Sequence, residues 1–207
     1  MSFIENVSNY SARWLASKVP NDKYPTVEDQ IEVFTYGFMV IWGFIFKIIL
    51  MVSLAYIFNI IIPIIILTLT FSSLRIIAGG YHLKTYNRCM IISALQFIVS
   101  ALIIKHTYQY WPIQNIYSLL FFCVLTTLYI IFRYIPRDTP NKPIIDPLQI
   151  KKFKRWSLYY LIAWTVVMTI FLLFNVHIIV IASCFGLLLE LFSVGRIGQS
   201  IYSKLDS

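Results

Sequence analysis

Six long apolar segments dominate this sequence and constrain its fold more than any other feature. A helix that crosses a membrane needs about 20 mostly apolar residues. Six segments approach or meet this length: residues 37–58, 60–77, 89–104, 113–132, 157–174 and 177–194. Since 59% of the 207 residues are hydrophobic and only 13% are charged, the apolar fraction exceeds that of a soluble domain. The sequence therefore predicts an all-α, polytopic membrane protein with six transmembrane helices.

Two asparagines mark the tightest turns between these segments. Residues 37–77 are too long for one span, so Asn59 is predicted to separate the first two helices. Pro63 follows at a position where a first helical turn tolerates proline. Asn175 is predicted to divide the last two spans in the same way. We treat the chain as one integral membrane domain: a cytoplasmic or interfacial segment at 1–36, a six-helix bundle at 37–194 and a cytoplasmic tail at 195–207.

The distribution of lysine and arginine predicts how the chain is oriented. Residues 133–155 hold seven of these cations and residues 75–88 hold three. The turns at Asn59 and Asn175 hold none, and the connection after residue 104 holds only Lys105. Because cytoplasmic loops collect lysine and arginine, both termini and the two basic connections are predicted to face the cytoplasm.

The N-terminal residues 3–19 differ from the six apolar segments. Phe3, Val7, Tyr10 and Trp14 recur there at helical spacing, and tryptophan suits the headgroup region of a membrane. We interpret this segment as an amphipathic helix that lies on the inner leaflet. The alternative is a poorly ordered terminus.

A polar stretch between the second and third apolar segments carries the strongest candidate chemistry. It places His82 and Cys89 seven residues apart, which is close to two turns of a helix, so both side chains would share one face if the stretch were helical. A thiol becomes a nucleophile when a nearby base takes its proton. The structural alternative is an interfacial histidine and a cysteine that behaves as a small hydrophobic residue.

Neighbouring residues favour the catalytic interpretation. Arg75, Lys84 and Arg88 supply positive potential, and a helix N-terminus near the cysteine would further stabilise its thiolate. Gly79 and Gly80 allow the backbone to approach a substrate closely or to take positive φ. Their N–H groups are therefore candidates to stabilise an oxyanion, whereas a simple helix break or close helix packing is the alternative.

A cluster of four cations lies in the long basic connection: Lys151, Lys152, Lys154 and Arg155. Its simplest role is to fix topology and to contact anionic lipid. A sharper hypothesis is that it binds an acidic peptide segment beside Cys89.

Two ionisable residues, Lys47 and Glu190, lie within predicted spans and are candidates for function. Two interpretations stay open: the two residues pair across the bundle, or Glu190 simply reaches the cytoplasmic headgroups, which the sequence favours over a direct pair. His106 and His177 are predicted on the external side, away from Cys89. The sequence assembles no set of metal ligands, so we expect neither a metal nor another cofactor.

A recognisable pattern surrounds the histidine and the cysteine. It consists of Arg75, Gly79-Gly80-Tyr81-His82, Thr85-Tyr86, Cys89 and, later, Pro140-Asn141-Lys142-Pro143. The chain resembles the accessory gene regulator protein B family of Gram-positive bacteria in this pattern, in its overall length and in the basic connection between its fourth and fifth apolar segments.

The resemblance implies a membrane cysteine endopeptidase that processes a quorum-sensing pro-peptide. His82 and Cys89 would be its catalytic pair, and Arg75 and Gly80 would also be required. The implied reaction removes an acidic C-terminal tail and closes a thiolactone ring. Leu83 departs from the family pattern, where a small residue is expected, and this difference should affect fit more than chemistry.

The expected partners are a peptide precursor of a cyclic autoinducer and anionic membrane lipid, but no nucleic acid; a homodimer is also compatible with the sequence. Two other function classes remain open. A small transporter would account for the spans but does not require His82 with Cys89. A non-enzymatic membrane adaptor with a palmitoylated Cys89 would account for the basic connection.

Overall fold

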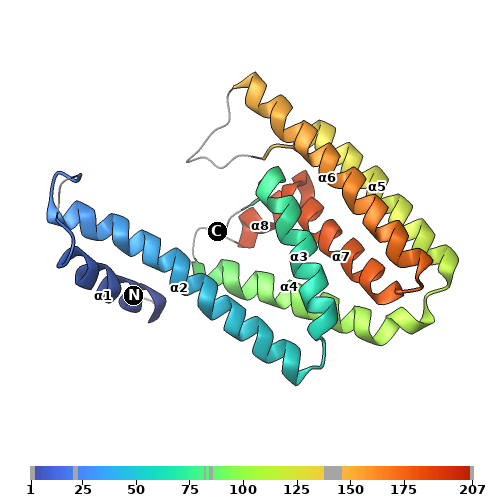
Figure 1. The fold of residues 1–207 in the computed structure, drawn as a ribbon, viewed down its shortest axis with the longest axis horizontal. Coiled ribbons are helices and arrows are strands. Elements are labelled where there is room, and N and C mark those ends of the chain that lie inside the picture. Colours follow the sequence, from blue (N-terminus) through green and yellow to red (C-terminus); the bar gives the residue numbers. More distant parts are fainter. Residues whose placement is uncertain (1–2, 21–22, 82, 84–85, 138–145, 206–207) are drawn as a thin grey trace. The chain divides into compact units, whose positions relative to one another are not determined.

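The structure is a computed structural model that describes residues 3–20, 23–81, 83, 86–137 and 146–205. The described chain is helical (Figure 1), with this order of elements: α1 (Phe3–Ala16), α2 (Val27–Ile57), α3 (Ile61–Ala78), α4 (Tyr86–Thr107), the short 3₁₀ helix η1 (Tyr108–Tyr110), α5 (Ile113–Tyr134), α6 (Pro147–Leu173), α7 (His177–Val194) and α8 (Arg196–Leu205). Six of these segments are long and apolar enough to cross a membrane. The predicted fold class is confirmed.

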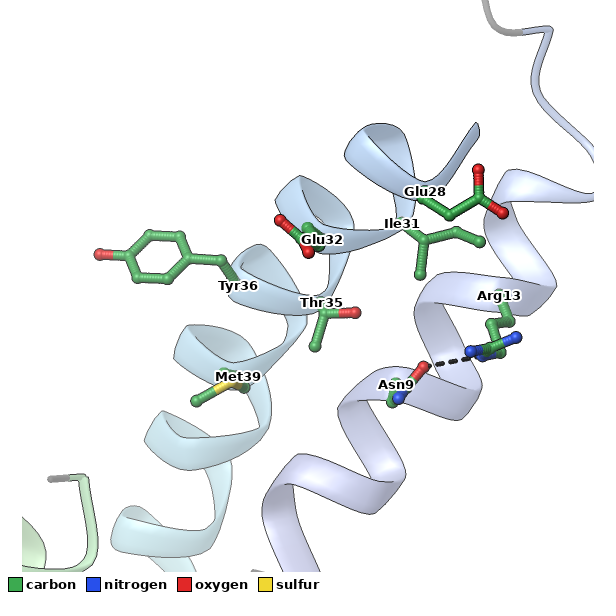
Figure 2. A pocket seen from close by; sticks show the side chains of 8 residues that line it. All are labelled: Asn9, Arg13, Glu28, Ile31, Glu32, Thr35, Tyr36 and Met39. Carbon is green, nitrogen blue, oxygen red and sulfur yellow. Dashed lines mark hydrogen bonds between the residues drawn. The ribbon is translucent and has the colours of Figure 1, made fainter. Parts of the chain in front are cut away.

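The chain divides into two compact units, Met1–Leu54 and Ala55–Ser207. The first unit holds α1 and most of α2. Trp42 of α2 donates a hydrogen bond from Nε1 to Oγ of Ser11 in α1 at 3.2 Å, and Ala12 is fully buried. A groove of about 390 Å³ lies in this unit, where Arg13 of α1 and Glu32 of α2 are among the lining residues (Figure 2). The predicted N-terminal helix is therefore present, and its place on a membrane surface stays a prediction.

Two of the spanning helices begin about ten residues earlier than the apolar segments predict, because polar caps start them. Thr26 and Asp29 form a reciprocal cap at the start of α2: Asp29 N–H donates to Thr26 Oγ1 and Thr26 N–H donates to Asp29 Oδ2, both at 3.1 Å. Asp146 accepts a hydrogen bond from the N–H of Leu148 at 2.9 Å, with Pro147 in the first position of α6. The apolar segments predicted at 37–58 and 157–174 therefore form the later parts of longer helices, since hydropathy does not register these polar first turns.

The turns that the sequence predicted at asparagine are confirmed. Asn59 and Asn175 have φ of 53° and 58°, the left-handed conformation that asparagine tolerates. Pro63 lies in the first turn of α3, as expected. These two turns separate α2 from α3 and α6 from α7.

Helix α7 forms the centre of the second unit. It contacts α3 most extensively and also contacts α4, α5, α6 and α8. Gly186 of α7 lies against the carbonyl of Leu67 in α3, where a Cβ atom would be only 2.5 Å from that oxygen. Small residues permit such close approach of helices in membranes. Contacts between α3 and α7 show that the two helices run in the same direction, as the second and sixth spans of a six-span chain must.

The predicted tail at 195–207 contains a helix that hydropathy did not reveal. Helix α8 packs against α7, and Gly198 lies so close to the carbonyl of Phe192 that any side chain there would collide with it. Tyr202 is the other buried residue of α8. The C-terminal segment is therefore joined to the bundle rather than extending from it.

Candidate active site

The chain turns sharply where α3 ends. Gly79 has φ of 78° and donates its N–H to the carbonyl of Arg75 at 2.9 Å, while the carbonyl of Ala78 accepts a hydrogen bond from the N–H of Arg137 at 2.8 Å. Gly80 follows with φ of 153°. A Cβ atom on Gly80 would lie 2.7 Å from both Nη1 of Arg75 and Oγ of Ser193. The paired glycines therefore provide both a positive-φ turn and a close approach, as the sequence suggested.

Arg75 is the centre of a cluster of charged and polar groups between α3 and α7. Its Nη1 donates to Oε2 of Glu190 at 3.1 Å and to Oγ of Ser193 at 3.0 Å. Its Nη2 donates to the carbonyl of Tyr81 at 2.6 Å. Ser193 also donates to Oε2 of Glu190 at 3.0 Å. We call Arg75, Glu190 and Ser193 the Arg75 cluster; it links the end of α3, the end of α7 and the turn between α3 and α4.

Glu190 has a charged partner on the neighbouring helix that the sequence did not identify. Its carboxylate forms an ion pair with Nη1 of Arg75 at 3.1 Å. The alternative that Glu190 extends to lipid headgroups is wrong, because its side chain is 0% exposed. A charge buried in a helix bundle needs a paired and hydrogen-bonded partner, and Arg75 supplies one from the neighbouring helix.

Tyr202 of α8 contacts the turn that follows α3. Its ring stacks on Tyr81 with a centroid distance of 5.7 Å, and the amide Nε2 of Gln96 lies 2.8 Å from its hydroxyl. Burial raises the pKa of the Tyr202 phenol above its usual value. Glu190 and Cys89 raise this pKa further, while the hydrogen bond with Gln96 and the charge of Arg75 lower it. Cys89 and the Arg75 cluster are therefore both within electrostatic range of the same hydroxyl.

Cys89 is distinct from the other two cysteines. It is the fourth residue of α4 and is half-buried. Cys123 and Cys184 are 0% exposed, and the thiol of Cys123 lies 3.9 Å from the carbonyl of Cys184. The predicted position of Cys89 near a helix N-terminus is confirmed.

The helical argument that joined His82 to Cys89 does not hold. Helix α4 begins at Tyr86, and the neighbouring residues Tyr81 and Leu83 are not helical. His82, Lys84 and Thr85, like Pro140-Asn141-Lys142-Pro143, lie outside the described residues. The pairing of His82 with Cys89 therefore stays a prediction.

The four predicted substrate-binding cations lie on the first turns of α6 rather than in a loop. Lys151, Lys152 and Arg155 are exposed. Lys154 instead donates from Nζ to the carbonyl of Phe132 at 2.9 Å, at the C-terminal end of α5, where a cation is favourable. Their predicted role in binding a peptide is not decided by this placement.

Comparison with known proteins places the chain in a family. The sequence model described as accessory gene regulator B matches residues 8–194. The chain belongs to the accessory gene regulator B family. It is 26% identical over 214 residues to putative AgrB-like protein 2 of Clostridium perfringens, covering 99% of this chain and 97% of that protein. It is 30% identical over 156 residues to accessory gene regulator protein B of Staphylococcus aureus, covering 75% and 76%. No solved structure matches it significantly.

The predicted family is confirmed, and with the six spans it makes this chain a multi-pass membrane protein. Membership in the accessory gene regulator B family is consistent with the processing of a quorum-sensing autoinducer. Three residues near the candidate site were not singled out from the sequence: Gln96, Ser193 and Tyr202. Ser193 carried a usable signal, because it lies three residues after Glu190 and so shares its helix face.

Proposed function

We propose that this member of the accessory gene regulator B family is a cysteine endopeptidase that cleaves a peptide precursor and forms a thiolactone through an acyl-enzyme on Cys89. The single observation that supports it most is the environment of Cys89. This thiol is half-buried at the start of α4 and its charge acts on the Tyr202 phenol, whereas the other two cysteines are fully buried.

The proposed reaction keeps the acyl group activated, because its second step exchanges one thioester for another. His82 takes the proton of Cys89, and the thiolate attacks the carbonyl carbon at the processing site. The C–N bond breaks, the departing amine takes the proton from the His82 imidazolium, and the peptide remains on Cys89 as a thioester. A cysteine thiolate within the peptide then attacks this thioester, which closes the thiolactone and releases the Cys89 thiolate.

The backbone near Gly80 is proposed to stabilise the oxyanion that forms in these steps. The N–H of Gly79 already donates to the carbonyl of Arg75. Of the two glycine N–H groups, the one on Gly80 is therefore the better candidate to stabilise the oxyanion. A site at the edge of a membrane also limits the access of water, which would otherwise hydrolyse the thioester.

The test is a processing assay with purified protein and a synthetic peptide that carries one internal cysteine and an acidic C-terminal tail. Wild-type protein should yield the tail and the thiolactone, and rapid acid quenching should trap a peptide mass added to Cys89. Cys89→Ser and His82→Ala should each abolish processing while the protein still inserts. Cys123→Ser is the matched control and should remain active. Processing by Cys89→Ser at the wild-type rate would show that the nucleophile is elsewhere.

The cations of α6 are proposed to bind the acidic tail. Replacing Lys151, Lys152 and Arg155 by glutamine should raise KM several-fold more than it lowers kcat, and high salt should mimic the change. A precursor with a neutralised tail should be insensitive to these substitutions, because the two changes remove the same interaction. Additive losses, or losses that follow the anionic lipid content, would assign the cations to topology and lipid contact.

The orientation of the chain is likewise a proposal, with both termini and the turn after α3 in the cytoplasm. Reporter fusions after Asn59, Trp111 and Asn175 should be external. A cytoplasmic signal from the fusion after Trp111 would overturn this topology.

A further inference from the structure

We propose that Glu190 is a positioning residue that orients Arg75, so that the guanidinium holds the Tyr81 carbonyl and thereby fixes the backbone immediately before His82. This inference rests on the proposed function, because it gives Glu190 a task in aligning the His82 base with Cys89. It concerns a residue of α7 that lies more than 100 positions from His82 in the sequence.

Arg75 and α7 together hold the carbonyl and the N–H of Tyr81. Its carbonyl accepts a hydrogen bond from Nη2 of Arg75 at 2.6 Å, and its N–H donates to the carbonyl of Ser193 at 3.4 Å. The ring of Tyr81 also stacks on Tyr202. The residue before His82 is therefore restrained on three sides, and two of these restraints involve the Arg75 cluster.

Glu190 determines how the guanidinium of Arg75 is oriented. The planar guanidinium presents its donors at fixed angles, so a bond that holds Nη1 also sets the direction of Nη2. Nη1 is held by Oε2 of Glu190 and by Oγ of Ser193, and Ser193 is itself bonded to the same oxygen. The guanidinium also lies over the ring of Phe71, with Cζ 5.3 Å from the ring centroid. Removing the carboxylate would leave Nη2 free to rotate away from the Tyr81 carbonyl.

The charge of Glu190 is not needed merely to pack α3 against α7. A buried ion pair adds little or no net stability compared with well-packed apolar residues. The Glu190 carboxylate is only partly satisfied, since Oε1 accepts no hydrogen bond from the residues that the structure describes. The same two helices also contain a neutral contact between Thr70 and Ser183, which joins α3 to α7 without any charge. Helix packing alone therefore does not account for Glu190.

The test measures the reactivity of Cys89 toward iodoacetamide as a function of pH, and it needs no peptide substrate. Alkylation follows the thiolate fraction, so its midpoint reports the thiol pKa. A paired His82 imidazolium should place the wild-type midpoint below about 8.5, the value of a free thiol. His82→Ala should raise the midpoint, and Glu190→Gln should raise it toward the same value. A rise of one unit corresponds to a roughly tenfold lower alkylation rate at a pH well below both midpoints.

The sign of the shift separates positioning from a direct charge effect. Neutralising a nearby carboxylate, and leaving Arg75 unpaired, would by electrostatics alone lower the pKa of Cys89. A rise in Glu190→Gln therefore requires that His82 has lost its alignment. Arg88, next to Cys89 in the sequence, and Tyr202, whose phenol senses the charge of Cys89, are unchanged in every variant. Ser183→Ala is the matched control, because it removes a buried hydroxyl from the same helix without touching the turn, and it should keep the wild-type midpoint.

The outcomes are distinguishable. A wild-type midpoint in Glu190→Gln, with a raised midpoint in His82→Ala, would overturn the positioning role and leave the proposed dyad intact. A wild-type midpoint in His82→Ala would overturn both. If Glu190→Gln fails to accumulate in the membrane, Ser193→Ala replaces it: this variant removes one hydroxyl from the Arg75 cluster and should raise the midpoint in the same direction, and an unchanged midpoint there overturns the inference. Glu190→Asp, which keeps the charge, should recover part of the wild-type value.

Discussion

Two polar clusters join α3 to α7, and they differ in what they hold in place. The Thr70 cluster consists of Thr70, Ser183 and Trp164: the Ser183 hydroxyl lies 2.8 Å from the Thr70 hydroxyl and accepts a hydrogen bond from Nε1 of Trp164 at 2.7 Å. Its members are neutral, and each side chain projects from a helix. The Arg75 cluster lies roughly 10 Å further along α7, at 1.5 Å per residue.

The Arg75 cluster is charged, and it ends on the backbone of the turn that precedes His82 rather than on another helix. Changes in the Thr70 cluster should therefore alter only the free energy of unfolding. Changes in the Arg75 cluster should alter the catalytic rate of molecules that are fully folded. A tightly packed glycine lies near each cluster, Gly80 near the Arg75 cluster and Gly186 on the same helix as Ser183, so the comparison can be tested with matched substitutions.

The largest effect is expected from Gly80→Ala, beside the Arg75 cluster. Alanine at φ of 153° is strained, and its Cβ would lie 2.7 Å from both Arg75 and Ser193, so the turn must move. A displacement of about 1 Å near reacting groups lowers a rate by about 100-fold, and we expect a loss in kcat/KM of this size. The measurement is processing of the synthetic precursor by protein whose circular dichroism matches wild type. Wild-type activity in Gly80→Ala would remove the distinction between the clusters.

A smaller loss is expected from Arg75→Lys. Lysine keeps the positive charge but lacks the planar fork, so it cannot hold Glu190 and the Tyr81 carbonyl in fixed directions at once. We expect kcat to fall about tenfold, which is equivalent to about 1.4 kcal/mol of transition-state stabilisation, with KM little changed. The control is the melting temperature in detergent, which should stay near that of wild type. A change in KM alone would instead assign Arg75 to substrate binding.

The contrast between these clusters also shows what the sequence can and cannot reveal. Hydropathy predicts the six spans, and asparagine marks the turns at Asn59 and Asn175, because these signals are local. The early starts of α2 and α6 were missed because polar caps extend a helix beyond its apolar part. Family resemblance identifies Arg75, but its pairing with Glu190 depends on how α3 packs against α7, and no local pattern contains that information.

Near the Thr70 cluster, Gly186→Ala should affect folding rather than catalysis. Its Cβ would lie 2.5 Å from the Leu67 carbonyl, so α3 and α7 must separate slightly, and overpacking of this kind costs about 1–3 kcal/mol. We expect a lower melting temperature and a lower yield of folded protein. Activity per folded molecule, counted by titration of Cys89 with iodoacetamide, should stay within about twofold of wild type, since a change of 0.4 kcal/mol or less is expected at the site. A larger specific loss would show that the two clusters are coupled.

The smallest effect is expected from Ser183→Ala. This substitution removes the hydroxyl that Thr70 and Trp164 share and leaves Nε1 of Trp164 without that acceptor. Hydrogen bonds between helices in membranes contribute modestly, so the expected loss is about 1 kcal/mol in the free energy of unfolding. Unfolding in mixed micelles with increasing sodium dodecyl sulfate measures this change, and Ser193→Ala provides the matched substitution in the Arg75 cluster. Ser183→Ala should lose stability with unchanged kcat, whereas Ser193→Ala should lose kcat; equal effects of the two on kcat would contradict the proposed difference between packing and positioning.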